Sequence, residues 1–274
     1  MKYKIKKSIF KIAGALALAV LVAGSLRYFN KQNVSKPPRT GGVVSMLPSN
    51  TEILFALGVD DISGVSSFCN WPPEAQNIQK LGDSFAPDIE GIIKLKPRVV
   101  FLGEDNSFDL APRIRRYGLN VVVVPNAKRV EDIYSNIELI AKNTGKDASQ
   151  VIAELKEIVG VKPPLTKRVY IEVDSGYFTA GGQSFISDFF EYHGAKNIFK
   201  NIKEEYFQTS LEAILERRPD VVYKMLPLNY KDDGEVLPTG KEVFVFDPDI
   251  YARPSVRALQ NIRTPGRKIK TAAK

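Results

Sequence analysis

The chain has 274 residues and is poor in the side chains on which most metal and redox sites depend, since it holds one cysteine and one histidine. With Cys69 as the only cysteine, no disulfide can form within the chain. A transition-metal site normally recruits several histidines together with carboxylates, so a single His193 argues against one. We therefore expect neither a metal site nor an intrachain disulfide.

Motifs of catalysis and nucleotide binding are also missing. A Ser-His-Asp triad would have to use His193, which follows an expected helix, and the sequence contains no G-x-S-x-G elbow. The glycine run Ala180–Ser184 lacks both the lysine of a P-loop and the third glycine of a dinucleotide fingerprint. We expect a structural role for His193 and for Cys69, with a reactive thiol as the alternative for Cys69. The sequence favours a protein that is not an enzyme and carries no cofactor.

The net charge of +8 comes from the two ends of the chain. Residues 1–40 hold nine basic residues and no acid, and residues 263–274 hold five more and no acid. The remaining body, 41–262, has 25 basic and 31 acidic residues. An acidic body has no electrostatic footprint for nucleic acid, so no nucleic-acid partner is expected.

Residues 1–29 have the pattern of an export segment. Five lysines precede an apolar run over 12–26, which is shorter than a membrane-spanning helix prefers and ends in small residues. Ser25 stands where a lipoprotein would carry its lipidated cysteine. Both a cleaved signal peptide and an uncleaved membrane anchor remain open. Residues 30–41 are polar and contain proline, as expected for a tether.

A duplicated unit organises the body of the chain. DIEGIIKLKPRVVFL over 88–102 and SLEAILERRPDVVYK over 210–224 align at seven positions, including Pro97 with Pro219. In each copy a polar cap, Asp88 or Ser210, precedes a short helix that the proline ends, and a β-branched pair then begins a buried strand. The duplication predicts two similar α/β lobes, 42–128 and 161–274, unless such units recur by chance.

One apolar pattern runs between the two expected lobes. From Ile133 to Ile158 its apolar positions step by three or four, and Gly145 does not interrupt the phase. We expect a single long helix within 129–160 that joins the lobes rigidly. Two ordinary helices with a turn at 143–145 are the alternative.

Aromatic side chains gather in loops that glycine or proline interrupts, where helix or strand periodicity does not explain them. In doubly wound lobes, ligands bind beyond the carboxyl ends of the strands, so these loops are expected to face a ligand cleft between the lobes. Such aromatics suit a large, flat, mainly apolar ligand, although some of them are expected to fold back onto the core. The set is Phe68, Trp71, Phe85, Tyr177, Phe178, Tyr206, Phe207 and Tyr251.

Several segments within 42–262 resemble one family in unbroken order. They are SMLPSNTEILFALG, GVSSFCNWPPEAQ, the two duplicated units, the helical stretch with NTGK, FTAGGQSFISDFFEYHGAKNIF and DIYARPSVRAL. Together they resemble the ABC-importer substrate-binding proteins whose two lobes are joined by a rigid helix. The loop 67–74 is most similar to the cobalamin-binding branch of that group. Trp is frequent there at the positions of Phe85 and Tyr206, which is a departure in this chain.

The resemblance implies an extracytoplasmic, monomeric receptor that passes cobalamin or a related corrinoid to an ABC importer permease. It also implies that Glu90 and Glu212, one on each matched helix, dock on the permease, although a helix-start acid needs no partner. Haem or a ferric siderophore is the alternative ligand, and an anchored sensor or an enzyme on the same scaffold is the alternative class. The ligand-binding residues implied are Ser49, Phe68, Trp71, Phe85, Phe178, Tyr206, Asp249, Tyr251 and Arg253.

Overall fold

The computed structural model describes residues 41–83, 85–226, 241–264 and 266–269. The expected signal peptide or anchor over 1–29, nearly all of the tether over 30–41, and most of the loop before β10 lie outside these residues. Among the described residues, no helix combines the length and the apolar character needed to cross a bilayer.

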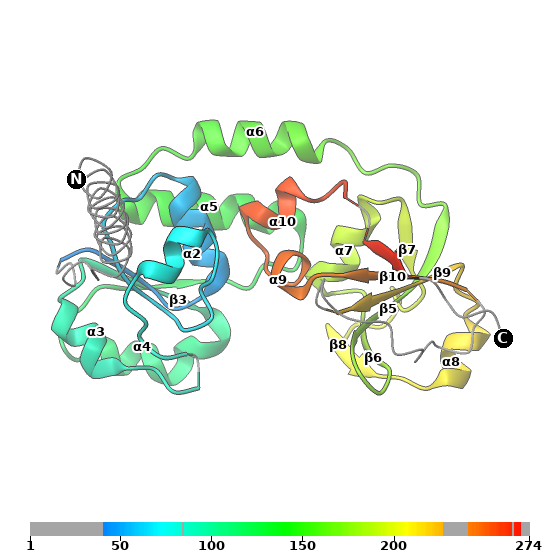
Figure 1. Cartoon of the computed structure of the whole chain (residues 1–274), viewed down its shortest axis with the longest axis horizontal. Coiled ribbons are helices and arrows are strands. Elements are labelled where there is room, and N and C mark those ends of the chain that lie inside the picture. The colour runs from blue at the N-terminus through cyan, green and yellow to red at the C-terminus, as the bar shows by residue number, and fades with distance from the viewer. Residues whose placement is uncertain (1–40, 84, 227–240, 265, 270–274) are drawn as a thin grey trace, which may run out of the picture. The chain divides into compact units, whose positions relative to one another are not determined.

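The first lobe is a parallel sheet of four strands in the order β2-β1-β3-β4, with helices on both faces (Figure 1). Alternate strand residues face opposite sides, so Val44 and Val100 pack with α3 and α4, whereas Val43 and Val99 pack with α2 and α5. Two 3₁₀ turns, η1 (Pro73–Asn77) and η2 (Glu104–Asn106), lie in its loops. Its elements are β1 (Val43–Ser45), α2 (Pro48–Ala56), β2 (Ile62–Val65), α3 (Ile89–Leu95), β3 (Val99–Gly103), α4 (Ser107–Arg115) and β4 (Val121–Val124).

The second lobe is a mixed sheet in the order β11-β10-β9-β5-β6-β8, and β7 also pairs with β5. Strands β5, β7, β9 and β10 are parallel, whereas β6, β8 and β11 join in antiparallel pairs. Its elements are β5 (Lys167–Asp174), β6 (Phe178–Ala180), α7 (Phe185–Glu191), β7 (Ala195–Asn197), β8 (Tyr206–Gln208), α8 (Leu211–Glu216), β9 (Val221–Met225), β10 (Glu242–Phe246), α9 (Pro248–Tyr251), α10 (Val256–Gln260) and β11 (Arg267–Ile269). The expected α/β fold with two lobes is confirmed.

The duplication extends to strand register. In the first lobe Val99 pairs with Val43 of β1, and Val100 pairs with Val121 of β4. In the second lobe the aligned Val221 pairs with Val169 of β5, and Val222 pairs with Val243 of β10. Both helix caps are as expected, because the side chain of Asp88 accepts from Gly91 N–H and that of Ser210 accepts from Ala213 N–H. The two copies therefore occupy equivalent central positions in the two sheets.

In each copy, the residue between the helix and the proline has a strained, left-handed backbone conformation. Lys96 and Arg218, which directly precede Pro97 and Pro219, have φ angles of 47° and 46°. A following proline disfavours the right-handed helical conformation, so the chain leaves the helix through a left-handed residue that a side chain makes costly.

Replacing either left-handed residue with glycine is expected to stabilise the protein. Lys96→Gly or Arg218→Gly should raise the free energy of unfolding by about 0.5–1 kcal/mol. The strain energy that glycine removes from the folded state is larger than the free energy lost to the greater conformational entropy of the unfolded chain. Urea unfolding measures the change. Lys94→Gly, inside α3 at a right-handed position, is the control and should lower stability by about the same amount. Equal destabilisation by all three variants would contradict the prediction.

The expectation of a single helix across 129–160 is wrong, because the segment forms α5 (Val130–Thr144) and α6 (Ser149–Val159). Gly145 ends α5 in the left-handed conformation at φ 70°, and the N–H of Lys146 bonds back to the carbonyl of Ala141. Asp147 then accepts from the N–H of Ser149 as α6 begins.

The two helices run in opposite directions between the lobes (Figure 1). The start of α5 is held at α7, where Val130 N–H donates to Asp188 and Tyr192 donates to Glu131. Its end lies in the first lobe, beside Arg98. α6 returns to the second lobe, where Arg263 donates to the carbonyl of Val161 just after the helix. A helical hairpin, rather than one rod, thus joins the lobes.

A single apolar core crosses from one lobe to the other. It includes Val43 and Val99 of the first sheet, Val169 and Val221 of the second, and the buried faces of α2, α5, α6, α7 and α10. Moving the lobes apart would expose part of this surface, at about 25 cal/mol per Å². The continuous core therefore favours a fixed arrangement of the two lobes.

Candidate ligand-binding site

The loop after β2 carries Phe68 and Trp71, and both side chains are partly exposed, with relative accessibilities of 53% and 42%. Between them, Cys69 points inward and is 1% exposed, with its Sγ 3.1 Å from Thr51 Oγ1 and 3.2 Å from Ser66 Oγ. Lys80 fixes the loop from outside by donating to the carbonyls of Cys69 and Ala75. The position of Cys69 agrees with its expected structural role, and the loop presents its aromatics outward.

Phe85 lies at the tip of a second loop of the first lobe. The carboxylate of Asp83 accepts from the N–H groups of Phe85 and Ala86 at 2.8 and 2.9 Å, and Gly82 pairs with Pro87 across the loop. This turn leaves Phe85 91% exposed. An exposed phenylalanine on a loop closed by hydrogen bonds is available for contact with a ligand.

In the second lobe, the pairing of β6 with β8 places some of the expected aromatic residues on the exposed face and others on the buried face. Phe178 pairs with Gln208 and Ala180 with Tyr206, so Phe178 and Tyr206 are diagonal neighbours on one face. They are 37% and 39% exposed. Phe207 lies on the opposite face of the ladder and packs, with Tyr177, against the core around Tyr170. Alternation along the strand thus selects which aromatics face solvent.

Tyr251 does not lie with the exposed aromatics, which corrects its expected place in the site. It is 6% exposed, makes edge contacts with Phe189 and Phe246, and donates its hydroxyl to the carbonyl of Thr264. The short helix α9 turns this side chain inward and leaves Asp249, two residues earlier, at the surface. Ser49, in the first turn of α2, is 8% exposed and offers little contact surface.

A polar network joins the loop after β2 to the chain around α9 and α10. Asn70 donates to Asp249 at 2.8 Å and accepts from Arg253 at 2.7 Å, and Arg253 also donates to Asp249 at 2.6 Å. Glu52 of α2 lies 3.8 Å from Arg253 and 3.9 Å from Arg257. We call Glu52, Asn70, Asp249, Arg253, Ser255 and Arg257 the arginine network; it places Asp249 and Arg253 beside Trp71.

Glu52 is the most deeply buried charged member of the arginine network, at 4% exposure. Ser255 donates to one of its oxygens, whereas its Oε1 accepts no hydrogen bond among the described residues. Desolvation raises the pKa of Glu52 to about 7, against the opposing effects of Ser255 and the two guanidinium groups. The carboxyl therefore titrates near neutral pH.

A second polar network crosses the lobes next to Tyr206. Lys128, in the loop after β4, forms an ion pair of 2.6 Å with Glu205, the residue before β8. Asn126 ties this loop to Glu104 and Asp105, whose charges also act on Lys128. We call these five residues the lysine network. Its acids outnumber its single base.

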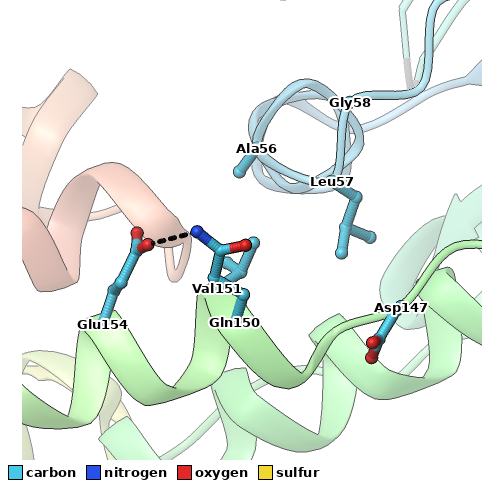
Figure 2. A pocket seen from close by; sticks show the side chains of 7 residues that line it. All are labelled: Ala56, Leu57, Gly58, Asp147, Gln150, Val151 and Glu154. Atoms are coloured by element: carbon cyan, nitrogen blue, oxygen red, sulfur yellow. Dashed lines mark hydrogen bonds between the residues drawn. The ribbon is translucent and has the colours of Figure 1, made fainter.

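The hollow of about 320 Å³ shown in Figure 2 is a different place. It lies between the end of α2 and the start of α6, where Gln150 donates to Glu154. No aromatic side chain lines it, and none of its residues belongs to the expected site. We therefore do not place the ligand there.

The sequence did not identify Glu52, Asn70, Lys128 or Arg257 as part of the site. Glu52 carried a signal, since it is the only charged residue of its helical stretch and apolar residues follow it directly. A lone acid on a buried helix needs a partner, and Arg253 and Arg257 have the four-residue spacing that could supply two cations. Asn70 and Lys128 carried no such signal.

Comparison with known proteins identifies one family and several relatives that match most of the chain. A family described as "Periplasmic binding protein" matches residues 43–261. An uncharacterized ABC transporter substrate-binding lipoprotein of Bacillus subtilis is 29% identical over 84% of this chain and 79% of its own length. A vitamin B12-binding protein of Vibrio parahaemolyticus is 26% identical over 80% of this chain and 86% of its own.

Solved structures share the fold. A possible iron-binding periplasmic protein of Staphylococcus epidermidis has a TM-score of 0.71 at 25% identity, and the match covers 82% of this chain and 96% of that one. A periplasmic haem-binding protein of Vibrio cholerae has a TM-score of 0.69 at 19% identity, with 81% and 96% covered. Proteins named for different ligands thus share this architecture.

Proposed function

The chain belongs to the periplasmic binding protein family and is a substrate-binding protein of an ABC transporter, and from this premise we propose that its ligand is cobalamin or a related corrinoid. The family is a class of transport proteins and not of enzymes. The proposal places the ligand between the loop after β2 and the β6–β8 ladder, outside the cytoplasm.

The exposed aromatic side chains of both lobes are the observation that carries this proposal. Phe68, Trp71 and Phe85 come from the first lobe, and Phe178 and Tyr206 from the second. Aromatic faces offer large contact area to a flat macrocycle at low cost in side-chain entropy. The vitamin B12-binding relative of Vibrio parahaemolyticus supports the same choice.

The charges of the two polar networks favour a ligand without carboxylates. Arg253 and Arg257 are 16% exposed and already face Glu52 or Asp249, and Lys128 faces Glu205. Together the networks hold five acids and three bases. A haem with two propionates, or an anionic siderophore, would compete with these acids for cations, whereas the amide groups of a corrinoid would not.

Two side chains of the types that ligate haem iron, His193 and Tyr206, are poorly suited to that role here. The ring of His193 packs against Phe189 and Phe190 in the core, and desolvation lowers its pKa to about 4. Desolvation and the neighbouring Glu205 raise the pKa of Tyr206, which disfavours the phenolate that ferric iron prefers. Both observations disfavour haem, whose iron takes an axial ligand from the protein, relative to a corrinoid.

The test is to mix the purified full-length chain separately with cobalamin, haem and a ferric siderophore, to desalt each mixture, and to record absorbance spectra. Cobalamin is expected to co-elute with the protein. Retention of haem or the siderophore without cobalamin would contradict the proposal.

Trp71→Ala is expected to weaken cobalamin binding by about 1–3 kcal/mol, because the indole supplies contact area that alanine lacks. Titration followed by corrinoid absorbance gives the Kd. Tyr117→Ala is the matched control, since Tyr117 is also an exposed aromatic residue, at 63%. Tyr117 follows α4 and lies where the strands begin, whereas the candidate site lies where the strands end. An unchanged Kd for Trp71→Ala would remove this residue from the site.

We further propose that Glu90 and Glu212 dock the receptor on its permease. Both are exposed in the first turns of α3 and α8, the helices of the duplicated unit. The N–H of Glu212 and the Ser210 side chain lower the pKa of Glu212, so its carboxylate is charged at neutral pH. Each lobe thus presents one acid in the same local structure.

A further inference from the structure

Trp71 is held from across the lobe boundary. The guanidinium carbon of Arg257, in α10 of the second lobe, lies 4.5 Å from the centroid of the Trp71 ring. Arg257 is 16% exposed, whereas Trp71 retains 42% exposure. A cation over an indole face is attracted by the ring quadrupole, and the planar guanidinium also stacks on it. One part of the indole is therefore covered and another remains open.

Arg257 is itself fixed by a buried partner. Its Nη1 lies 3.9 Å from Oε1 of Glu52, which α2 of the first lobe carries. Ser255, two residues earlier in the chain and fully buried, donates to the other oxygen of Glu52. The guanidinium thus lies between a buried carboxyl and the indole, and both come from the first lobe.

The residue next to Trp71 is anchored to the same part of the second lobe. Asn70 bonds both Asp249 and Arg253, so the loop after β2 contacts the α9–α10 segment through two consecutive residues. Figure 1 shows α9 and α10 between the two sheets, and α10 packs against α2. The orientation of the indole therefore depends on residues more than 170 positions away in the sequence.

We propose that Arg257 is a positioning residue, which Glu52 holds in place and which orients the Trp71 indole so that its open part meets the ligand. This inference rests on the proposed function for the ligand contact of Trp71. The positioning of the indole itself rests on the contacts of the two lobes alone. The binding surface of the first lobe is thus completed by a side chain of the second.

Intrinsic fluorescence tests the positioning directly, because Trp71 is the only tryptophan of the chain. In the full-length chain, Arg257→Gln is expected to shift Trp71 emission to longer wavelength and to increase its quenching by acrylamide. Cobalamin titration of the same variant should give a Kd about tenfold higher. Arg257→Lys keeps the charge beside Glu52 but loses the planar stack, so it should fold and show intermediate values.

Arg217→Gln is the matched control, because Arg217 lies 4.6 Å from the centroid of the Phe199 ring and contacts no residue of the site. It should leave the emission, quenching and Kd at wild-type values. Emission and quenching that are the same in Arg257→Gln, Arg257→Lys and Arg217→Gln would overturn the proposal, as would altered fluorescence with an unchanged Kd. If the wild-type chain retains no cobalamin, the proposed function fails, whereas the fluorescence comparison still decides whether Arg257 positions Trp71.

Discussion

The double charge reversal Glu90→Lys with Glu212→Lys is expected to abolish ligand uptake while leaving ligand binding unchanged. Each lobe would present one acid to a basic permease surface, and reversal turns both attractions into repulsion. The two residues lie at the starts of α3 and α8, and neither belongs to the arginine network or the lysine network. Uptake by cells and the Kd of the purified receptor are the two measurements.

Each single reversal is expected to reduce uptake only in part. The duplicated units share their caps and the left-handed residue after the helix, so the two lobes present their glutamates in the same local structure. When the charge of one glutamate is reversed, the glutamate of the other lobe can still contact the permease. Folding should be almost unaffected, since Glu90 and Glu212 are both exposed.

A control with the same change in net charge separates docking from general electrostatics. Glu138→Lys with Glu157→Lys reverses two exposed acids of α5 and α6, outside the duplicated units. This variant should import ligand normally. Normal uptake by the Glu90 and Glu212 double variant would show that these residues are helix-start acids without a partner.

The second large effect expected is a change in the pH dependence of stability when Glu52 is replaced with glutamine. A carboxyl whose folded pKa is raised from 4.5 to about 7 binds more protons when folded than when unfolded. The free energy of unfolding therefore falls as the pH rises from about 4.5 to 7, by about 3 kcal/mol at most. Glu52→Gln removes this fall.

His193 contributes the opposite slope over almost the same range. Its folded pKa is about 4, against 6.5 when exposed, so the unfolded chain binds more protons between these values. Its contribution to the free energy of unfolding rises by about 3 kcal/mol from pH 4 to 6.5. The two contributions nearly cancel in the wild-type chain between pH 4.5 and 6.5.

Urea unfolding at constant ionic strength from pH 4 to 8 measures both slopes. Glu52→Gln should gain stability relative to the wild-type chain as the pH rises through 4.5–7. His193→Phe, which keeps an aromatic ring beside Phe189 and Phe190, should lose stability relative to it through 4–6.5. Differences between each variant and the wild-type chain cancel the background of the other carboxylates. Three parallel curves would contradict the assignment of both pKa values.

Much of the fold could be predicted because it depends on short-range patterns. The caps Asp88 and Ser210, the prolines after α3 and α8, and the β-branched pairs that begin β3 and β9 are all local features. Their repetition was sufficient to predict two similar lobes. The structural role of Cys69 could be predicted on a different ground, since the sequence offers its thiol no partner for catalysis.

The break between α5 and α6 shows where a periodic pattern is insufficient. Ile133, Ile137, Ile152 and Leu155 all face the core that the lobes share, so the apolar spacing continues in phase through a reversal of direction. Gly145 was visible in the sequence, and its left-handed conformation ends α5 at a position where the apolar spacing alone predicted a continuous helix. The spacing of apolar residues indicates which face of a helix is buried, but it does not indicate whether the chain continues in the same direction.

The two lobes, the duplicated units and the set of aromatic residues from which the candidate site is drawn could all be predicted from the sequence. Which of these aromatics are exposed depends on the packed chain, since alternation in the β6–β8 ladder turns Phe207 inward while Phe178 stays outside. The packing of the two lobes also brings Glu52, Asn70 and Arg257 beside Trp71. The hydrogen bonds of Asn70 to Asp249 and of Ser255 to Glu52 join residues 179 and 203 positions apart. Local propensity and periodicity act over a few residues, so contacts at such separations arise only when the two lobes pack.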